Sequence, residues 1–140
     1  MKRFEYIDHT ADIAIKAYGF DLAEAFAAAA EGLMAVITGE AELSGGEPDS
    51  FEYESIDQPG LLVGMLSELI VRHEVEGVVM SEFDVELLDG AKLRCSYRKQ
   101  PFDKSQHGEG IHVKGVAYHM LEMHEGGAGE PSHVQVLFDI

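Results

Sequence analysis

The chain has 140 residues, with 26 acidic and 10 basic side chains and a formal net charge of −16 at pH 7. This length suits one compact domain, and we expect residues 1–140 to form it. A surface this negative repels phosphate, so we expect no direct nucleic-acid binding. Because Cys95 is the only cysteine, an internal disulfide and a thiolate zinc cluster are excluded.

The N-terminal residues 1–5 contain no apolar signal-peptide core, and no apolar run approaches the roughly 20 residues that a membrane helix needs. We therefore expect a cytoplasmic protein that does not associate with membranes. The negative charge alone favours a simple role in solubility over cation binding or docking onto a basic partner.

The first third of the chain predicts a strand followed by a helix. Residues 4–18 are expected to form one strand, entered through a polar turn at 8–12 and alternating from Ile13 onward. A helix is predicted next, because apolar side chains recur at helical spacing over 22–37 and Asp21 can cap its start.

The middle of the chain predicts a second strand and a second helix. Residues 38–49 are rich in glycine and acids and indicate a loop, whereas residues 50–55 alternate as a short strand. Pro59 is expected in the first turn of the second helix, and Gly77 is expected to end it.

Four strands are predicted in the remainder, over residues 78–89, 92–98, 111–122 and 133–140. Asp89-Gly90 is a strong hairpin signal between the first two. The order is therefore β-α-β-α followed by four strands. Two helices cannot cover both faces of so large a sheet. This predicts an α+β fold, a two-layer sandwich with a mainly antiparallel sheet of about six strands and both helices on one face.

Two aspartates at opposite ends of the chain lie on the polar faces of predicted strands. If these strands meet, the carboxylates of Asp12 and Asp139 converge with the α-carboxylate of Ile140. An all-oxygen set of this kind suits Ca²⁺ or Mg²⁺ better than zinc. The simpler alternative is that Asp8 and Asp12 cap a turn and that Asp139 is solvated.

None of the seven histidines shows the spacing of a known metal-ligand motif. His73 and His119 are predicted to lie in the core, and His112 and His124 to face solvent. His9 lies between two acids, which could raise its pKa and make it an acid–base or orienting group. Stabilising the turn is its simpler role.

Lys114 is the only basic residue between Ile111 and His124, apart from histidines. It either solubilises an exposed face or lies near the acidic residues and contacts a phosphate or a partner carboxylate. Cys95 is predicted to be inert in mid-strand, and no serine has the context of a nucleophile. No complete enzyme motif therefore emerges from the residues alone.

Segments along nearly the whole chain resemble the archease family. They are Asp8-His9-Thr10-Ala11-Asp12-Ile13 with Ala17-Tyr18-Gly19, Glu24-Ala25-Phe26, Glu68-Leu69, Glu76-Gly77, Phe83 with Val85, Pro101-Phe102-Asp103 before His107, Lys114 to His119, and Phe138-Asp139-Ile140. The first and last segments are the most specific. The chain departs from the family pattern at Ser67 and His133, where tryptophan is frequent, and at Gly115 and Ala117.

This resemblance implies a non-enzymatic activator of the tRNA-splicing RNA ligase, which promotes guanylylation of the ligase and its multiple turnover. It also implies that Asp12, Asp139 and Ile140 bind a divalent cation, typically calcium, with Mg²⁺ or Mn²⁺ as alternatives. Lys114 matches a family position implicated in activation. Asp8 and His9 are candidates for supporting the ligands or contacting the partner.

Two alternatives belong to other functional classes. One is a chaperone-like partner of RNA-modifying enzymes such as a tRNA methyltransferase, a role that is also linked to the family. The other is a metal-dependent hydrolase built on Asp12 and Asp139. The absence of a nucleophile, or of a base other than His9, counts against the hydrolase.

Overall fold

The computed structural model describes residues 3–7, 12–89 and 91–140. In chain order its elements are β1 (Arg3–Ile7), β2 (Ile13–Gly19), α1 (Leu22–Thr38), β3 (Glu47–Glu54), α2 (Gln58–Glu76), β4 (Val78–Leu88), β5 (Lys92–Pro101), α3 (Lys104–His107), β6 (Gly115–His124) and β7 (Ser132–Asp139). All strand pairings among these residues are antiparallel. The predicted α+β class and antiparallel pairing are therefore confirmed.

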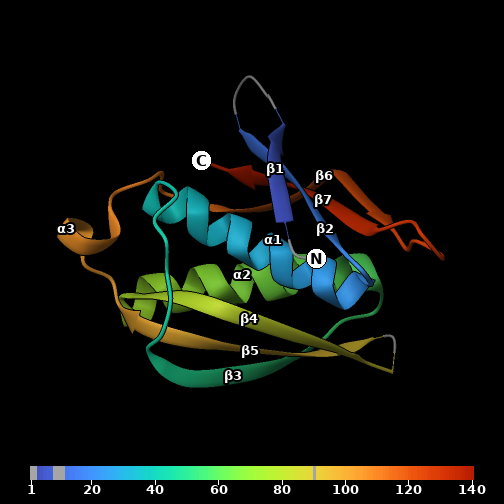
Figure 1. Cartoon of the computed structure of the whole chain (residues 1–140), viewed down its shortest axis with the longest axis horizontal. Helices are drawn as coiled ribbons and strands as arrows, with labels where there is room; N and C mark the ends of the chain where they lie inside the picture. The colour runs from blue at the N-terminus through green and yellow to red at the C-terminus, as the bar shows by residue number, and fades with distance from the viewer. Residues whose placement is uncertain (1–2, 8–11, 90) are drawn as a thin grey trace.

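The strands form two sheets rather than one. Four of them pair in the order β1-β2-β7-β6 and three in the order β3-β5-β4. The long helices α1 and α2 lie between the two sheets and contact strands of both (Figure 1). The expected single sheet of about six strands with helices on one face is corrected to seven described strands in two sheets around a helical layer.

The composition of α1 explains this layering. Its alanine-rich sequence is buried along most of its length, and Phe26 and Leu33 are fully buried. A helix that is apolar all round needs cover on both sides, which one sheet cannot supply. The second sheet provides that cover, with Met80 and Phe83 of β4 buried in the same core.

The predicted first strand, residues 4–18, is in fact two strands. β1 and β2 pair with each other in a register that runs from Arg3 opposite Tyr18 to Ile7 opposite Ala14. The chain therefore reverses direction between Ile7 and Ala14. One strand of that length would also be far longer than the usual 5–6 residues.

The predicted helix boundaries are confirmed. The Asp21 carboxylate accepts a hydrogen bond of 2.8 Å from the backbone N–H of Glu24, which caps α1. Pro59 lies in the first turn of α2, and Gly77 ends that helix in the left-handed conformation, with φ of 67°.

Among the described residues, no helix combines the length and apolarity needed to cross a membrane.

Two strands contain irregularities that alternation alone does not reveal. The register of β4 shifts between Ser81 and Asp84, where Glu82 has a φ of 55°. The register of β6 shifts between Ala117 and Glu122. β6 also begins and ends later than the predicted strand 111–122. Such bulges bend a strand and redirect its side chains.

Candidate functional site

β2 and β7 are neighbouring central strands of the four-stranded sheet, so the first and last parts of the chain meet. Their antiparallel register pairs Ile13 with Phe138. Asp12 directly precedes Ile13 and Asp139 directly follows Phe138, so the two aspartates lie at the same end of these strands. Asp12 is half-buried and Asp139 is exposed. We call Asp12, Asp139 and Ile140 the acidic tip.

Lys114 lies beside the acidic tip. Its backbone N–H donates a hydrogen bond of 2.7 Å to the carbonyl oxygen of Asp139. The next residue, Gly115, is the register partner of Asp139 at the start of β6. The Lys114 side chain is exposed. The structure therefore brings Lys114 close to Asp139, which the strand prediction for residues 111–122 could not establish.

Asp8 and His9 lie outside the described residues. Their suggested roles, supporting the ligands or contacting a partner, stay predictions. In the sequence they fall between the last residue of β1, Ile7, and Asp12.

The donors of the acidic tip fit a hard cation, because they are all carboxylate oxygens, the ligands that Ca²⁺ and Mg²⁺ prefer. Among the described side chains, no group of three or more His, Cys, Asp or Glu is placed to hold a metal ion. The two aspartates would therefore need the Ile140 carboxylate, and oxygens from water or a partner, to complete a coordination shell. The metal site stays a prediction.

Three of the four histidine predictions that fall on described residues agree with the structure. His73 is half-buried and its Nδ1 lies 2.7 Å from the carbonyl oxygen of Val78. His112 and His124 are exposed, as predicted. His119 is also exposed, so its predicted core position is wrong. The reason is the register shift of β6, which interrupts the alternation that placed His119 inward.

Cys95 is fully buried in β5. Burial raises the pKa of its thiol to about 12. A thiol of that pKa holds almost no nucleophilic thiolate at neutral pH. The prediction that Cys95 is inert therefore agrees with its position.

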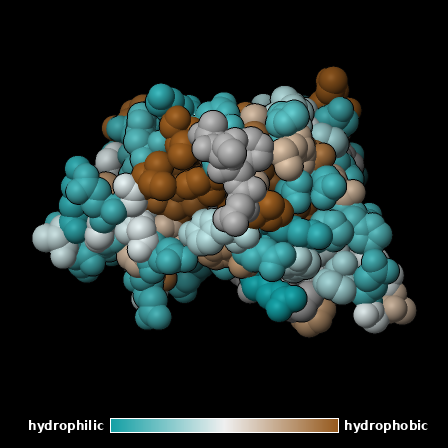
Figure 2. Space-filling model, turned by 90° about the horizontal axis from the view of Figure 1, so that it is seen from above, coloured by the Kyte–Doolittle hydropathy of each residue, from teal (hydrophilic) through white to brown (hydrophobic). Residues whose placement is uncertain are grey.

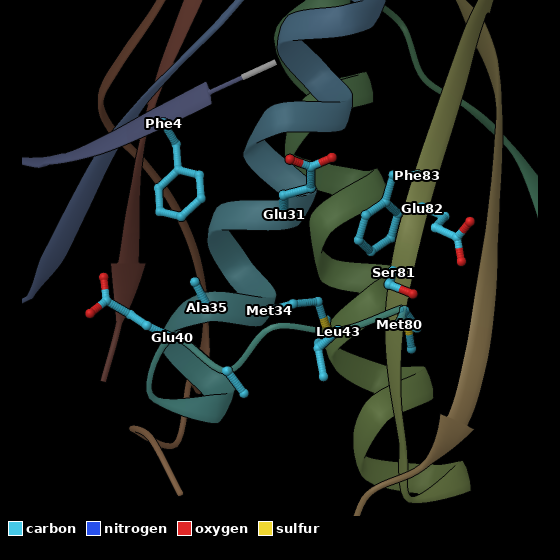
Figure 3. Close-up of a pocket in the computed structure, with 11 residues that line it drawn as sticks. Phe4, Glu31, Met34, Ala35, Glu40, Leu43, Met80, Ser81, Glu82 and Phe83 are labelled. Atoms are coloured by element: carbon cyan, nitrogen blue, oxygen red, sulfur yellow. The ribbon is translucent and has the colours of Figure 1, made fainter. Parts of the chain in front are cut away.

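The structure also has a hollow that the sequence did not indicate, between β1, α1 and β4 (Figure 3). Its volume is about 530 Å³. Glu31, Glu40 and Glu82 contribute carboxylates to a mainly apolar lining that includes Phe4, Met34, Leu43, Met80 and Phe83. The bulge in β4 shapes one wall. The bulge has no local sequence signature, which is why the strand prediction missed the hollow.

Apolar side chains also gather near the acidic tip. Figure 2 shows a cluster of apolar residues on the face seen from above. Tyr6 and Ile111 are both 44% exposed, and together with Ile13 they line a shallow hollow of about 220 Å³. Ile13 adjoins Asp12 in the chain, so an apolar surface flanks the acidic tip.

A charged network joins α2 to the three-stranded sheet. Asp49 lies 3.1 Å from the Lys99 ammonium and 3.5 Å from the Arg72 guanidinium, and it accepts a hydrogen bond from the Tyr97 hydroxyl. Burial raises the pKa of Asp49, but the hydrogen bonds from Ser50, Lys99 and Tyr97 outweigh it and lower that pKa overall. Burial also raises the pKa of Tyr97, to about 12. This cluster contributes to stability.

Comparison with known proteins gives a consistent match. The model of the Archease protein family (MTH1598/TM1083) matches residues 4–140. "Protein archease" of Pyrococcus abyssi is 36% identical over 126 residues, which cover 88% of this chain and 89% of that protein. "Protein archease" of Methanothermobacter thermautotrophicus is 35% identical with the same coverage of both chains.

Two solved structures share the fold. The solution structure of Methanobacterium thermoautotrophicum protein 1598 matches with a TM-score of 0.78 and 31% identity, covering 98% of both chains. The crystal structure of an archease from Thermotoga maritima, described as a "possible chaperone", matches with a TM-score of 0.60, covering 97% of this chain and 96% of that one. At 20% identity, the second match shows similarity of fold alone.

Proposed function

This chain belongs to the archease family, and from that premise we propose that it is a non-enzymatic activator of a tRNA-splicing RNA ligase. It would promote guanylylation of the ligase's active-site histidine and allow multiple turnovers. The observation that carries this proposal is the pairing of β2, β7 and β6, which gathers Asp12, Asp139 and Lys114 at one end of a sheet.

The acidic tip is the proposed cation site. Asp12, Asp139 and the Ile140 carboxylate would bind Ca²⁺, and Mg²⁺ or Mn²⁺ would use the same oxygen donors. The ion would supply positive charge at an otherwise negative end of the molecule. Because Asp12 directly precedes β2 and Asp139 ends the paired strand β7, the sheet holds their backbones in position, and little ordering is needed when an ion or partner binds.

The charge of the chain supports docking onto a basic surface. An RNA ligase binds the phosphates of its substrate, so its cleft must be basic. A protein with a formal charge of −16 is attracted to such a cleft and associates with it faster. Lys114, beside the acidic tip, carries a positive charge instead. Its exposed ammonium is suited to a partner carboxylate or to a nucleotide phosphate.

The decisive experiment measures RNA ligation by the cognate ligase with excess substrate and GTP, with and without this protein. We expect activation by the wild type and its loss in Asp12→Ala and Asp139→Ala variants that keep the fold. Absence of activation by the folded wild-type protein would refute the proposal.

A second candidate is a chaperone-like role toward RNA-modifying enzymes such as a tRNA methyltransferase. The apolar surface beside the acidic tip favours it, since chaperones bind exposed apolar segments. Suppression of methyltransferase aggregation, without an effect on ligation, would support this role over the first. Variants of Ile111 to a polar residue should then weaken the suppression.

A further inference from the structure

Two histidines are register partners at the end of the β6–β7 hairpin that lies away from the C-terminus. Figure 1 shows where this end of the hairpin lies. His124 closes β6, and its register partner His133 lies at the start of β7. Their ring centroids are 5.2 Å apart, and the ring planes differ by 31°. Opposed positions on antiparallel strands have Cβ atoms about 4.5–5.5 Å apart, so the sheet itself sets this spacing.

The spacing suits shared binding of one metal ion. Imidazole nitrogens bind zinc at about 2.0–2.1 Å, and two such rings at tetrahedral angles have centres roughly 5 Å apart. The rings of His124 and His133 are already at that separation.

His124 also has the carboxylate partner that metal-binding histidines usually have. Its Nε2 lies 2.8 Å from a carboxylate oxygen of Glu130. A carboxylate that accepts one ring N–H fixes the tautomer and orientation of the ring, and it makes the other nitrogen a better ligand. Because Glu130 takes up Nε2 of His124, the other ring nitrogen, Nδ1, would be the one that binds the ion.

His133 is available in its ligand form. Burial lowers its pKa, and the charges of Lys16 and His124 lower it further against the opposing charges of Glu122 and Glu130; a lower pKa favours the neutral imidazole that binds metal ions. Within the described part of the chain, neither ring nitrogen of His133 has a hydrogen-bond partner; its neighbours are the rings of Tyr18 and His124.

The space around the pair is open to water. A hollow of about 530 Å³ is lined by Glu122, Met123, His124, Glu130 and His133. Among the described residues, no three His, Cys, Asp or Glu side chains are placed to hold a metal ion, so an ion bound here would take two ligands from the imidazoles and the rest from water. The carboxylates of Glu122 and Glu130 add negative charge that favours a divalent cation.

We propose that His124 and His133 form a chelating site for Zn²⁺ or a similar imidazole-preferring ion, with Glu130 orienting His124. This site is separate from the acidic tip, because the two lie at opposite ends of the eight-residue strand β7, roughly 20 Å apart. It also differs in chemistry, since imidazole nitrogen selects transition metals and carboxylate oxygen selects Ca²⁺ or Mg²⁺.

The test is calorimetric titration of the full chain with Zn²⁺ at neutral pH, in excess Ca²⁺ so that carboxylate sites are occupied. We expect one Zn²⁺ per chain at this site, and a loss of affinity of at least about tenfold in His124→Ala and in His133→Ala, because each leaves a single imidazole. Glu130→Ala should weaken binding by about 10–100-fold through loss of the orienting hydrogen bond.

A matched control is His112→Ala. His112 also pairs with a carboxylate at 2.8 Å, that of Glu74, but the described strand pairings set no imidazole opposite it. Its replacement should leave Zn²⁺ affinity unchanged, as should Asp139→Asn, which separates this site from the proposed cation site.

Imidazole proton resonances give a second measurement on the wild-type protein, which does not depend on any variant folding. Zn²⁺ should shift the signals of His124 and His133 and not that of His112. The proposal fails if Zn²⁺ does not bind, if His124→Ala and His133→Ala bind as the wild type does, or if His112→Ala loses as much affinity as they do.

Discussion

The backbone N–H of Lys114 donates a hydrogen bond of 2.7 Å to the carbonyl oxygen of Asp139. This contact joins the residue before β6 to the end of β7 and fixes the backbone of Lys114 beside one acid of the acidic tip. Because the contact uses only main-chain atoms, either side chain can be replaced without breaking it. The roles of the carboxylate and the ammonium can therefore be tested separately.

Replacing Asp139 with asparagine should weaken Ca²⁺ binding by at least about tenfold, equivalent to about 1.4 kcal/mol. The amide is a neutral and poorer ligand than the carboxylate, and the side chain keeps its shape. Calorimetric titration with Ca²⁺ measures the change. Asp84→Asn is the matched control, since Asp84 is an exposed strand aspartate on the other sheet. Equal Ca²⁺ affinity in the two variants would exclude Asp139 as a ligand.

Lys114→Ala should lower activation of the ligase by about tenfold or more while leaving the acidic tip able to bind Ca²⁺. The ammonium is proposed to contact the partner or its nucleotide, and not the ion. Ligation rates and Ca²⁺ titration should be measured on the same preparation. Lys104→Ala is the control. It removes a similarly exposed ammonium, which pairs with Glu109, and the variant should activate the ligase as the wild type does. If Lys114→Ala activates fully, the ammonium has no part in the mechanism.

Gly110→Ala should lower the free energy of unfolding by about 1–3 kcal/mol. Gly110 donates a backbone hydrogen bond of 3.0 Å to Ile37, and a Cβ there would collide with the carbonyl oxygen of Val36. Backbone atoms at the end of α1 cannot move aside cheaply. Gly127→Ala, whose Cβ would meet nothing, should change stability by less than about 0.5 kcal/mol. Similar denaturant midpoints for both variants would contradict this close packing.

Asp49 should stabilise the folded protein at neutral pH, and this contribution should be lost in acid. Its hydrogen bonds hold the folded-state pKa below the ordinary value of 3.8, so its contribution is fully present above that pH and is lost as the pH falls through the folded-state pKa. We expect Asp49→Asn to cost about 1 kcal/mol at neutral pH and close to nothing in strong acid. Denaturant unfolding at both pH values measures this. A cost that does not depend on pH would show that the charge of Asp49 is unimportant.

Several elements could be predicted because their signals are local. Asp21 and Gly77 occupy the cap positions that were expected of them, and Pro59 lies in the first turn of α2. In β4, Phe83 and Val85 are buried while Asp84 between them is exposed. Caps and alternation act over a few neighbouring residues, so the sequence displays them directly.

Other features depend on contacts between distant segments and have no such signal. His119 was expected in the core, but the bulge of β6 turns it outward. The reversal between β1 and β2, and the division of the strands into two sheets, also departed from expectation. Alternation shows which face of a strand is apolar, but not which strand lies beside it or where its register shifts.

The acidic tip also combines features with a local signal in the sequence and features that depend on contacts between distant segments. The sequence by itself placed Asp12 and Asp139 on the polar faces of strands at opposite ends of the chain, and the family pattern drew attention to them and to Lys114. Only the tertiary structure decided that β2 pairs with β7 and β7 with β6, which brings the three residues together. It also decided that His124 opposes His133. The physical reason is that strand pairing is set by packing of both sheets against α1 and α2, an interaction of the whole chain.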